Sequence, residues 1–103
     1  MKDFIPISVK PSQLPSKPLS DRANFPTCSC VYFAQAGKDI VYVGKTKNLR
    51  KRWKNHHRFA QLEKLADIRI GWMAVTDPWM SAIEQDWIWS YKPSLNNSPN
   101  FSA

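Results

Sequence analysis

The fold is decided by residues 30–45, which run CVYFAQAGKDIVYVGK. β-Branched and aromatic residues are frequent at 30–34 and again at 40–44, as is typical of strands. The short stretch between them contains Gly37, which favours a tight turn. This part of the sequence therefore predicts an antiparallel β-hairpin.

Both tyrosines of the hairpin are expected on one face. If Gln35 pairs with Asp39 across a three-residue loop, Tyr32 lies directly opposite Tyr42. Because side chains alternate along a strand, the other face should carry Val31, Phe33, Val41 and Val43. We expect the apolar face to pack in the core and the tyrosine face to present two phenols.

A helix rich in basic residues is predicted after the hairpin. Thr46 or Asn48 can cap its start, and the helix is expected to run to about His57. Leu49 and Trp53 lie four residues apart and should form its buried stripe.

The remaining pattern completes an α/β fold. A short helix is expected at 59–65 and a third strand at 68–75. Asp77 then offers an N-cap, followed by Pro78 at the first position of a helix that should end near Tyr91. These elements predict a small central three-stranded antiparallel sheet flanked by helices.

The first 27 residues differ in composition from the rest of the chain. They contain five of the eight prolines, and each proline removes a backbone donor and disfavours a helix just before it. We interpret 1–27 as a proline-rich extended N-terminal arm, which lies along the domain or on a partner such as a second copy of the chain. Residues 28–103 are then the folded domain.

The overall charge favours an anionic partner. Fifteen Lys and Arg against eight Asp and Glu give a formal net charge of +7, which suits nucleic acid or an acidic membrane face. The apolar stretches are far shorter than the roughly 20 residues that span a bilayer, and no signal peptide is recognisable. We expect a cytoplasmic protein without a membrane partner. Cys28 and Cys30 offer neither a zinc-site spacing nor a disulfide framework.

Between positions 45 and 58 the chain has seven basic residues and no acidic residue. They are Lys45, Lys47, Arg50, Lys51, Arg52, Lys54 and Arg58. Such a run suits phosphate contacts, because affinity for nucleic acid comes largely from counterion release. The alternative is a solvated basic face, but ordinary surface helices mix both signs of charge.

Five motifs spread over residues 30–97 resemble the GIY-YIG nucleases. In order they are Cys30-Val31-Tyr32, Tyr42-Val43-Gly44-Lys45, Asn48-Leu49 with Arg52 and His56, Glu84, and Pro93-Ser94-Leu95-Asn96. The family includes homing endonucleases, some restriction enzymes and the N-terminal nuclease domain of the bacterial excision-repair incision subunit. Two positions depart from the pattern, since Cys30 replaces the usual Gly and Val43 replaces Ile.

The resemblance implies catalytic roles on the tyrosine face. Tyr32, with Tyr42 beside it, matches the tyrosine thought to take the proton from the attacking water. A free phenol has a pKa of about 10, so this role needs nearby positive charge to lower the pKa. Arg52 matches an arginine that can hold the scissile phosphate. His56, one helical turn further on, can relay a proton, bind phosphate or replace Tyr32 as general base, and His57 is interpreted as a surface residue.

Glu84 matches the metal ligand of the family. A lone carboxylate among apolar residues is costly unless it is paired or coordinates a cation, and one carboxylate with several waters suits Mg²⁺ or Mn²⁺. The alternative is a structural salt bridge to Arg52 or Lys45. Asn96 matches the terminal asparagine, which we expect to fix a loop or the Glu84 carboxylate, and we include it among the nucleic-acid-binding residues.

Together these implications predict a metal-dependent endonuclease that hydrolyses phosphodiester bonds of DNA, with RNA the less favoured substrate. The mechanism would use a single metal ion and a tyrosine as general base. The alternative is a catalytically inactive nucleic-acid-binding module of the same fold.

Overall fold

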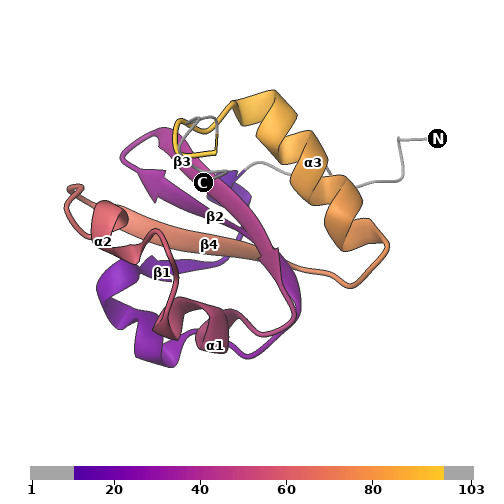
Figure 1. Ribbon diagram of the computed structural model, residues 1–103, viewed down its shortest axis with the longest axis horizontal. Coiled ribbons are helices and arrows are strands. Elements are labelled where there is room, and N and C mark those ends of the chain that lie inside the picture. Colours follow the sequence, from indigo (N-terminus) through magenta and orange to yellow (C-terminus); the bar gives the residue numbers. More distant parts are fainter. Residues whose placement is uncertain (1–10, 97–103) are drawn as a thin grey trace.

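A computed structural model describes residues 11–96 of the chain. The strands are β1 (Ser16–Pro18), β2 (Cys30–Ala36), β3 (Asp39–Thr46) and β4 (Ile68–Ala74). The helices are α1 (Leu49–Lys54), α2 (Phe59–Leu62) and α3 (Trp79–Tyr91), with short 3₁₀ helices η3 (Pro11–Gln13) and η4 (Leu19–Asn24). The strands form one antiparallel sheet in the order β1-β4-β2-β3 (Figure 1). None of the helices within residues 11–96 is long and apolar enough to cross a membrane.

The predicted α/β class and antiparallel sheet are confirmed, but the sheet has four strands instead of three. The fourth is β1, which pairs with β4 so that Ser16 lies opposite Gly71. Its sequence, Ser-Lys-Pro, has no alternating apolar pattern that could have indicated a strand. Pro18 is tolerated there because β1 is an edge strand, where a missing N–H need not disturb a ladder. From Pro11 onward the predicted arm lies along the domain, but it is not simply extended, because it forms η3, β1 and η4 and buries Leu19 and Phe25 in the core.

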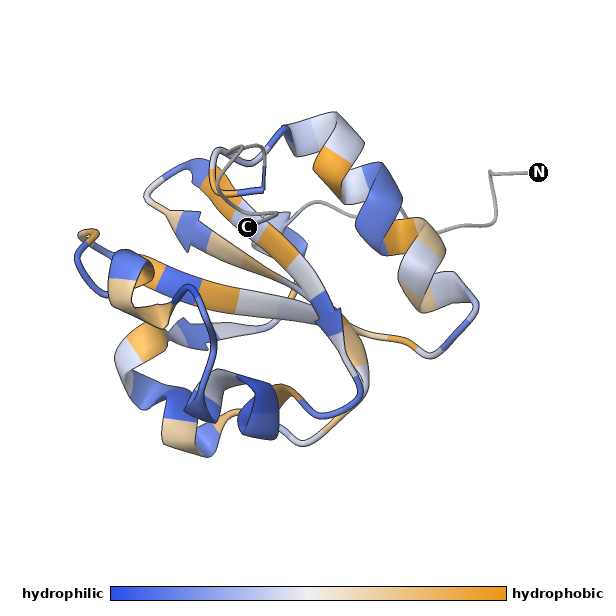
Figure 2. Ribbon diagram, viewed as in Figure 1, coloured by the Kyte–Doolittle hydropathy of each residue, from blue (hydrophilic) through white to orange (hydrophobic). Residues whose placement is uncertain are grey.

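Helices cover both faces of the sheet (Figure 1). On the tyrosine face, buried residues from η4, α1 and α2 form one core cluster with Tyr32 and Tyr42. On the other face, α3 packs Ile83 and Trp87 against Phe33 in a second cluster. The expectation that the tyrosine face would present two phenols is wrong, because the chain supplies enough apolar residues to cover both faces. Figure 2 shows α3 alternating between hydrophobic and hydrophilic residues, as a helix with one packed face should.

The register of the hairpin also differs from the prediction. Tyr32 pairs with Gly44 and Tyr42 pairs with Ala34, because an irregularity follows Ala34. The shift is by two residues along each strand, so both tyrosines still share a face, with ring centroids 6.3 Å apart. Val41, expected on the opposite face, packs instead against the cluster that contains the tyrosines.

The helix boundaries are partly as predicted. Asn48 caps α1, since its side chain accepts a hydrogen bond from Lys51 N at 3.0 Å. However, α1 ends at Lys54 rather than near His57, because the chain turns there to bury His56, whose ring stacks on Trp53.

The last helix ends at Tyr91 as expected, and Lys92 follows it in the left-handed conformation with φ 45°. The predicted Asp77 cap is wrong, because the N-cap position falls on Pro78. The Asp77 carboxylate accepts instead from Ser81 Oγ at 3.4 Å.

Gly44 makes room for the Tyr32 ring. A Cβ at this position would lie 2.5 Å from Tyr32 Oη and 2.6 Å from its Cζ. We predict that Gly44→Ala lowers the free energy of unfolding by about 1–3 kcal/mol through overpacking, measured by urea denaturation. Gly37→Asn is a matched control, because no atom lies within 4 Å of a Cβ there and Asn tolerates its φ of 61°. Equal losses in the two variants would contradict this packing constraint.

Candidate active site

The Tyr32 hydroxyl is the centre of the candidate site. It lies 2.8 Å from His56 Nε2 and accepts a hydrogen bond from Arg52 Nε at 3.3 Å. Tyr32 comes from β2, Arg52 from α1, and His56 from the turn that follows α1. The structure therefore brings together three residues that the sequence analysis predicted for the site, although His56 is not on the same helix as Arg52.

The hydrogen bonds of His56 fix its tautomer. Its Nδ1 accepts from the backbone N–H of Arg58 at 3.0 Å, so it carries no proton. Burial, and then the charge of Arg52, lower the pKa of His56 to about 3. The ring is therefore neutral at pH 7, with its one proton on Nε2, and it donates to Tyr32. The Tyr32 oxygen thus accepts two hydrogen bonds, both of which favour negative charge on it.

Aromatic rings hold the imidazole of His56 in place. The ring stacks on Trp53 at a centroid distance of 3.9 Å and an interplanar angle of 6°. His57 also stacks against it at 4.8 Å, and the Tyr42 ring meets it edge-on at 5.2 Å. His57 is exposed, as predicted for a surface residue, but it also lies 3.5 Å from Arg52 Nη2. Its adjacency to His56 was the only signal in the sequence that could have placed it at the site.

The acidity of both tyrosines is set mainly by burial. Tyr32 has no exposed surface, and this burial raises the pKa of its phenol, while Arg52 lowers the pKa by a smaller amount. Burial also raises the pKa of Tyr42, which is 8% exposed. The positive charge of Arg52 therefore does not offset the effect of burial on the pKa of Tyr32. The predicted role as a base requires a lowered pKa.

Glu84 projects from α3 beside the edge strand β3. Its carboxylate lies 3.9 Å from Lys45 Nζ, which also donates to Ser81 Oγ at 2.7 Å. Of the two partners proposed for a structural salt bridge, Lys45 is the one found. The pair is long and partly exposed, so it stabilises the fold little. Burial raises the pKa of Glu84 more than Lys45 lowers it.

Electrostatics connect Glu84 with the tyrosine face, because its charge contributes to the raised pKa of Tyr42. Within residues 11–96, no group of three or more His, Cys, Asp or Glu side chains could hold a metal ion. A cation at Glu84 would therefore have one carboxylate ligand and fill its other positions with water, which suits Mg²⁺. The incompletely compensated charge of Glu84 fits such a cation.

Asn96 fixes the segment after α3 to the sheet. Its Oδ1 accepts from Val43 N at 2.7 Å, and its Nδ2 donates to Val43 O at 2.9 Å. Of the two partners expected for Asn96, the structure shows the loop and strand rather than the Glu84 carboxylate. Nucleic-acid contact by Asn96 stays a prediction.

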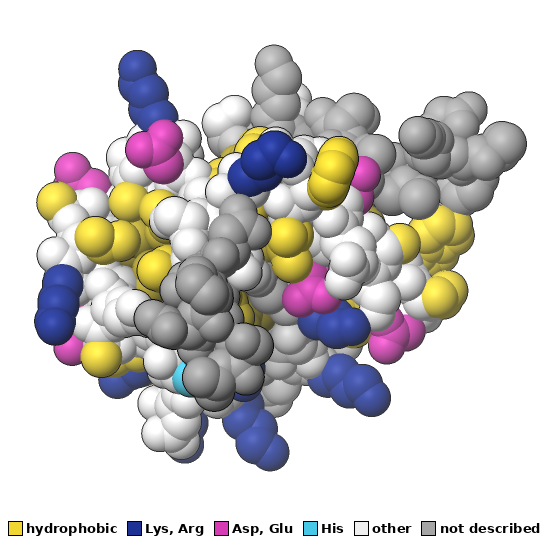
Figure 3. Space-filling view, turned by 45° about the horizontal axis from the view of Figure 1, so that its top comes forward, with side chains coloured by type: hydrophobic (Ala, Val, Ile, Leu, Met, Phe, Trp, Pro, Cys, Tyr) yellow, Lys and Arg dark blue, Asp and Glu magenta, His cyan; other side chains and the backbone are white. Residues whose placement is uncertain are grey.

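The predicted basic residues do not form one uniform surface. Lys47, Lys51 and Arg52 line a hollow of about 400 Å³ together with Thr46, Asn48 and Asn55. Arg50 instead donates to the carbonyl of Phe25 at 2.7 Å, and Lys45 faces Glu84. Figure 3 shows several Lys and Arg side chains projecting along the lower edge of the face that it draws. Phosphate binding by these residues stays a prediction, with the hollow as its best-formed part.

Comparison with known proteins agrees with this geometry. The family model of the GIY-YIG catalytic domain matches residues 28–97, so the chain belongs to the GIY-YIG family. No curated protein sequence matches it.

Solved structures of the GIY-YIG N-terminal endonuclease domain of UvrC from Thermotoga maritima share the fold. A point mutant bound to its catalytic divalent cation aligns with a TM-score of 0.66 and 20% identity, over 77% of this chain and 93% of that one. The magnesium-bound domain aligns with a TM-score of 0.63 and 21% identity, over 73% and 90% of the two chains.

The depressed pKa of His56 predicts a pH-dependent stability. An unfolded histidine titrates near pH 6.5, whereas folded His56 titrates at about 3. Below pH 6.5 the unfolded chain therefore binds a proton that the folded chain excludes, and stability falls as the pH falls. From pH 7.5 to 5.0, wild type should lose about 1–2 kcal/mol more free energy of unfolding than His56→Gln.

Urea denaturation at constant ionic strength measures this difference. His57→Gln serves as the control, because His57 is exposed and should contribute less to the pH dependence. Parallel pH profiles for wild type and His56→Gln would show that His56 is not held neutral by burial.

Proposed function

We propose that this chain is a Mg²⁺-dependent endonuclease that hydrolyses phosphodiester bonds of DNA. The observation that carries the proposal is the hydroxyl of Tyr32, which accepts hydrogen bonds from both Arg52 and His56. A structural tyrosine needs one partner for its hydroxyl, whereas two donors stabilise the negative charge that a proton acceptor carries. Membership of the GIY-YIG family supports the same reaction class.

Tyr32 suits the role of general base better than His56 does. His56 has no free lone pair, because Nδ1 accepts from Arg58 N and Nε2 carries the proton. In our proposal His56 donates a hydrogen bond to Tyr32 and orients it, while Tyr32 takes the proton of the attacking water.

The raised pKa of Tyr32 means that its phenolate would be a strong base but a rare one in the free protein. Formation of the phenolate would need additional positive charge, which a bound cation would supply along with stabilisation of the leaving oxygen.

Glu84 would hold that cation. The UvrC domain has been solved with magnesium as its catalytic cation, and the single partly buried carboxylate of this chain fits a largely hydrated Mg²⁺. Mn²⁺ prefers similar oxygen ligands and would serve in its place. Lys45, released from Glu84, would be free to contact a phosphate.

Arg52 would bind the scissile phosphate. Its Nε is occupied by Tyr32, but the residue is exposed and lines the basic hollow with Lys47 and Lys51. A phosphate there would lie close to the base and to fixed positive charge, which stabilises the transition state most. We favour DNA over RNA because the family resemblance includes homing and restriction endonucleases, and no residue of the site decides this choice.

The second candidate function is a nucleic-acid-binding module without catalysis. This second function is supported by the basic hollow, which would bind phosphates with or without a cation. Binding alone does not require a carboxylate beside the phosphate site, since it would repel the substrate. Glu84 therefore distinguishes the two functions.

We predict that Glu84→Gln lowers cleavage of plasmid DNA in Mg²⁺ by at least about a hundredfold, or about 3 kcal/mol of transition-state stabilisation. Affinity for the same DNA should be kept or increase, because a negative charge is removed. The melting temperature should not fall, because burial already disfavours the charged form of Glu84.

Glu63→Gln makes the same chemical change at an exposed position and is the control. A Glu84→Gln protein that is folded, binds DNA and cuts at the wild-type rate would exclude Glu84 as the cation ligand. A wild-type protein that binds DNA but does not cut it with Mg²⁺ or Mn²⁺ would favour the binding module.

A further inference from the structure

The segment from Leu19 to Pro26 lies upstream of the residues that match the catalytic domain, yet it packs against α1. We propose that Arg22, in this segment, is a positioning residue that fixes α1 and the turn carrying His56 and His57. The catalytic domain would then depend on chain outside itself for the geometry of its site. The link to catalysis rests on the proposed function, but the positioning itself does not.

Arg22 contacts one residue on each side of the segment 54–58, which contains the turn between α1 and α2. Its Nη1 donates to the carbonyl of Trp53 at 2.9 Å, in the last turn of α1. Carbonyls at the end of a helix lack partners within it, and a cation there also suits the helix dipole. The same guanidinium lies 3.7 Å from the ring centroid of Phe59, the first residue of α2. One side chain thus connects the two short helices that bound the turn.

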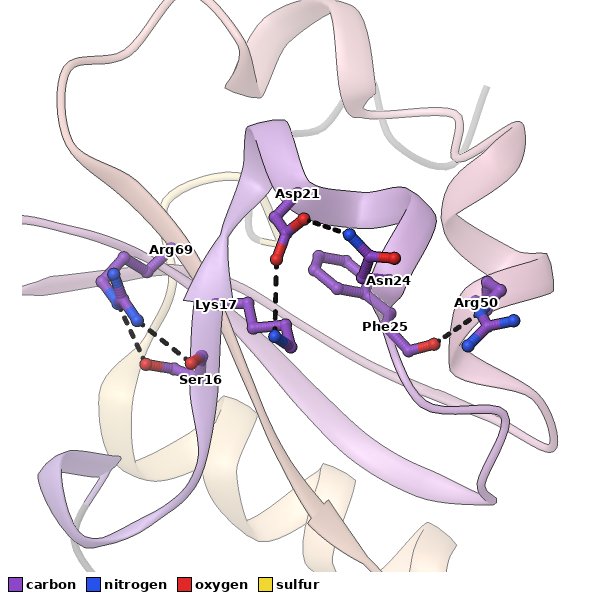
Figure 4. A network of polar contacts seen from close by, with 7 residues as sticks. All are labelled: Ser16, Lys17, Asp21, Asn24, Phe25, Arg50 and Arg69. Atoms are coloured by element: carbon purple, nitrogen blue, oxygen red, sulfur yellow. Dashed lines mark hydrogen bonds and ion pairs between the residues drawn. The ribbon is translucent and has the colours of Figure 1, made fainter.

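The other end of α1 is held by the same upstream chain. The backbone N–H groups of Leu49 and Arg50 donate to the carbonyls of Cys28 and Pro26 at 3.2 and 3.0 Å. Arg50 Nε also donates to the carbonyl of Phe25 at 2.7 Å (Figure 4). These bonds satisfy N–H groups that a helix start leaves free. Both ends of α1 are therefore fixed by the chain between Arg22 and Cys28.

The composition of α1 makes such support necessary. The helix has six residues, which is far below the about 12–15 needed for an isolated helix to be even marginally stable. Four of its residues are basic and none is acidic, and like charges three or four apart repel each other. Its stability must therefore come from tertiary contacts, in which the upstream segment takes a large part.

The contacts continue from the upstream segment to the site. Phe25 is fully buried and meets the Trp53 ring edge-on at 6.4 Å. Trp53 stacks on His56, which donates to the Tyr32 hydroxyl. A displacement of Trp53 would therefore move the imidazole away from the phenol.

The upstream segment is itself anchored to the sheet (Figure 4). Lys17 pairs with Asp21 at 3.4 Å, and Asn24 donates to Asp21 at 2.6 Å. Arg69 of β4 donates to the hydroxyl and the carbonyl of Ser16, each at 3.0 Å. Arg22 therefore projects from a segment that is itself fixed to the sheet.

Substitution of Arg22 tests the proposal on the full chain. Arg22→Met keeps an unbranched stem but removes the donor and the charge, and Arg22→Lys keeps the charge without the planar fork. Arg69→Met is the matched control, because Arg69 also binds the N-terminal segment but does not contact α1. The first readout is amide hydrogen exchange at residues 54–58, which needs no catalysis.

We expect exchange at 54–58 to rise at least about tenfold in Arg22→Met, while exchange in β2 and β4 stays near wild type. Arg22→Lys should fall between Arg22→Met and wild type, and Arg69→Met should leave residues 54–58 unchanged. If Arg22→Met does not fold, amide exchange at 54–58 in Arg22→Lys is compared with that in Arg69→Met, and a faster exchange in Arg22→Lys alone supports the proposal. Exchange at 54–58 that is unchanged in Arg22→Lys, or that rises only as much as in the strands, would overturn the proposal.

Cleavage kinetics separate this inference from the proposed function. If the chain is a nuclease, Arg22→Met should lower kcat by roughly tenfold to a hundredfold with KM nearly unchanged, because the contact between His56 and Tyr32 is disturbed while every phosphate-binding side chain is still present. Equal kcat in Arg22→Met and wild type would remove the catalytic link. Absence of cleavage in wild type would contradict the proposed function alone, because the exchange readout would still test the positioning by Arg22.

Discussion

Burial of the Tyr32 hydroxyl constrains the rest of the site. A buried polar group without a partner costs about 1–3 kcal/mol, and Tyr32 has no exposed surface. Its partners, Arg52 and His56, lie on α1 and on the turn after it, so the hydroxyl ties β2 to a helix that is too short to be stable alone. Gly44 leaves the space in which this arrangement fits. Tyr32 and His56 are thus packed in the core, while Arg52 and His57 beside them are exposed.

The charged groups of the site meet around the edge strand β3. The tyrosine face brings Arg52 and the two histidines together, whereas Glu84 comes from the helix that covers the opposite face. Tyr42 contacts His56, and the charges of both Arg52 and Glu84 affect its pKa. In the proposed reaction Arg52 would bind the phosphate from the tyrosine face, and Glu84 would hold the cation from the helix on the opposite face.

The helices and strands were easier to predict from the sequence than the points where they end and the contacts between them. Alternating residues in β2 and β3 indicated the hairpin and the sheet, because local pattern determines them. The grouping of Tyr32, Arg52 and His56 was instead implied by the resemblance to the GIY-YIG nucleases. The fourth strand, the end of α1 and the place of His57 depend on tertiary contacts that no local pattern encodes. The raised pKa of Tyr32 could not be foreseen either, because burial outweighs the neighbouring charge only once both faces of the sheet are covered.

The proposed role of Tyr32 depends most directly on the direction of its hydrogen bond with His56. Long-range ¹H–¹⁵N correlation spectra of the imidazole rings measure it, because the two ring nitrogens differ in chemical shift according to which one carries the proton. We expect His56 to be neutral with its proton on Nε2 from pH 7.5 to 5.0, since Nδ1 accepts from Arg58 N. A protonated His56 in this range, or a neutral ring with its proton on Nδ1, would contradict the assignment of Tyr32 as the acceptor of two hydrogen bonds.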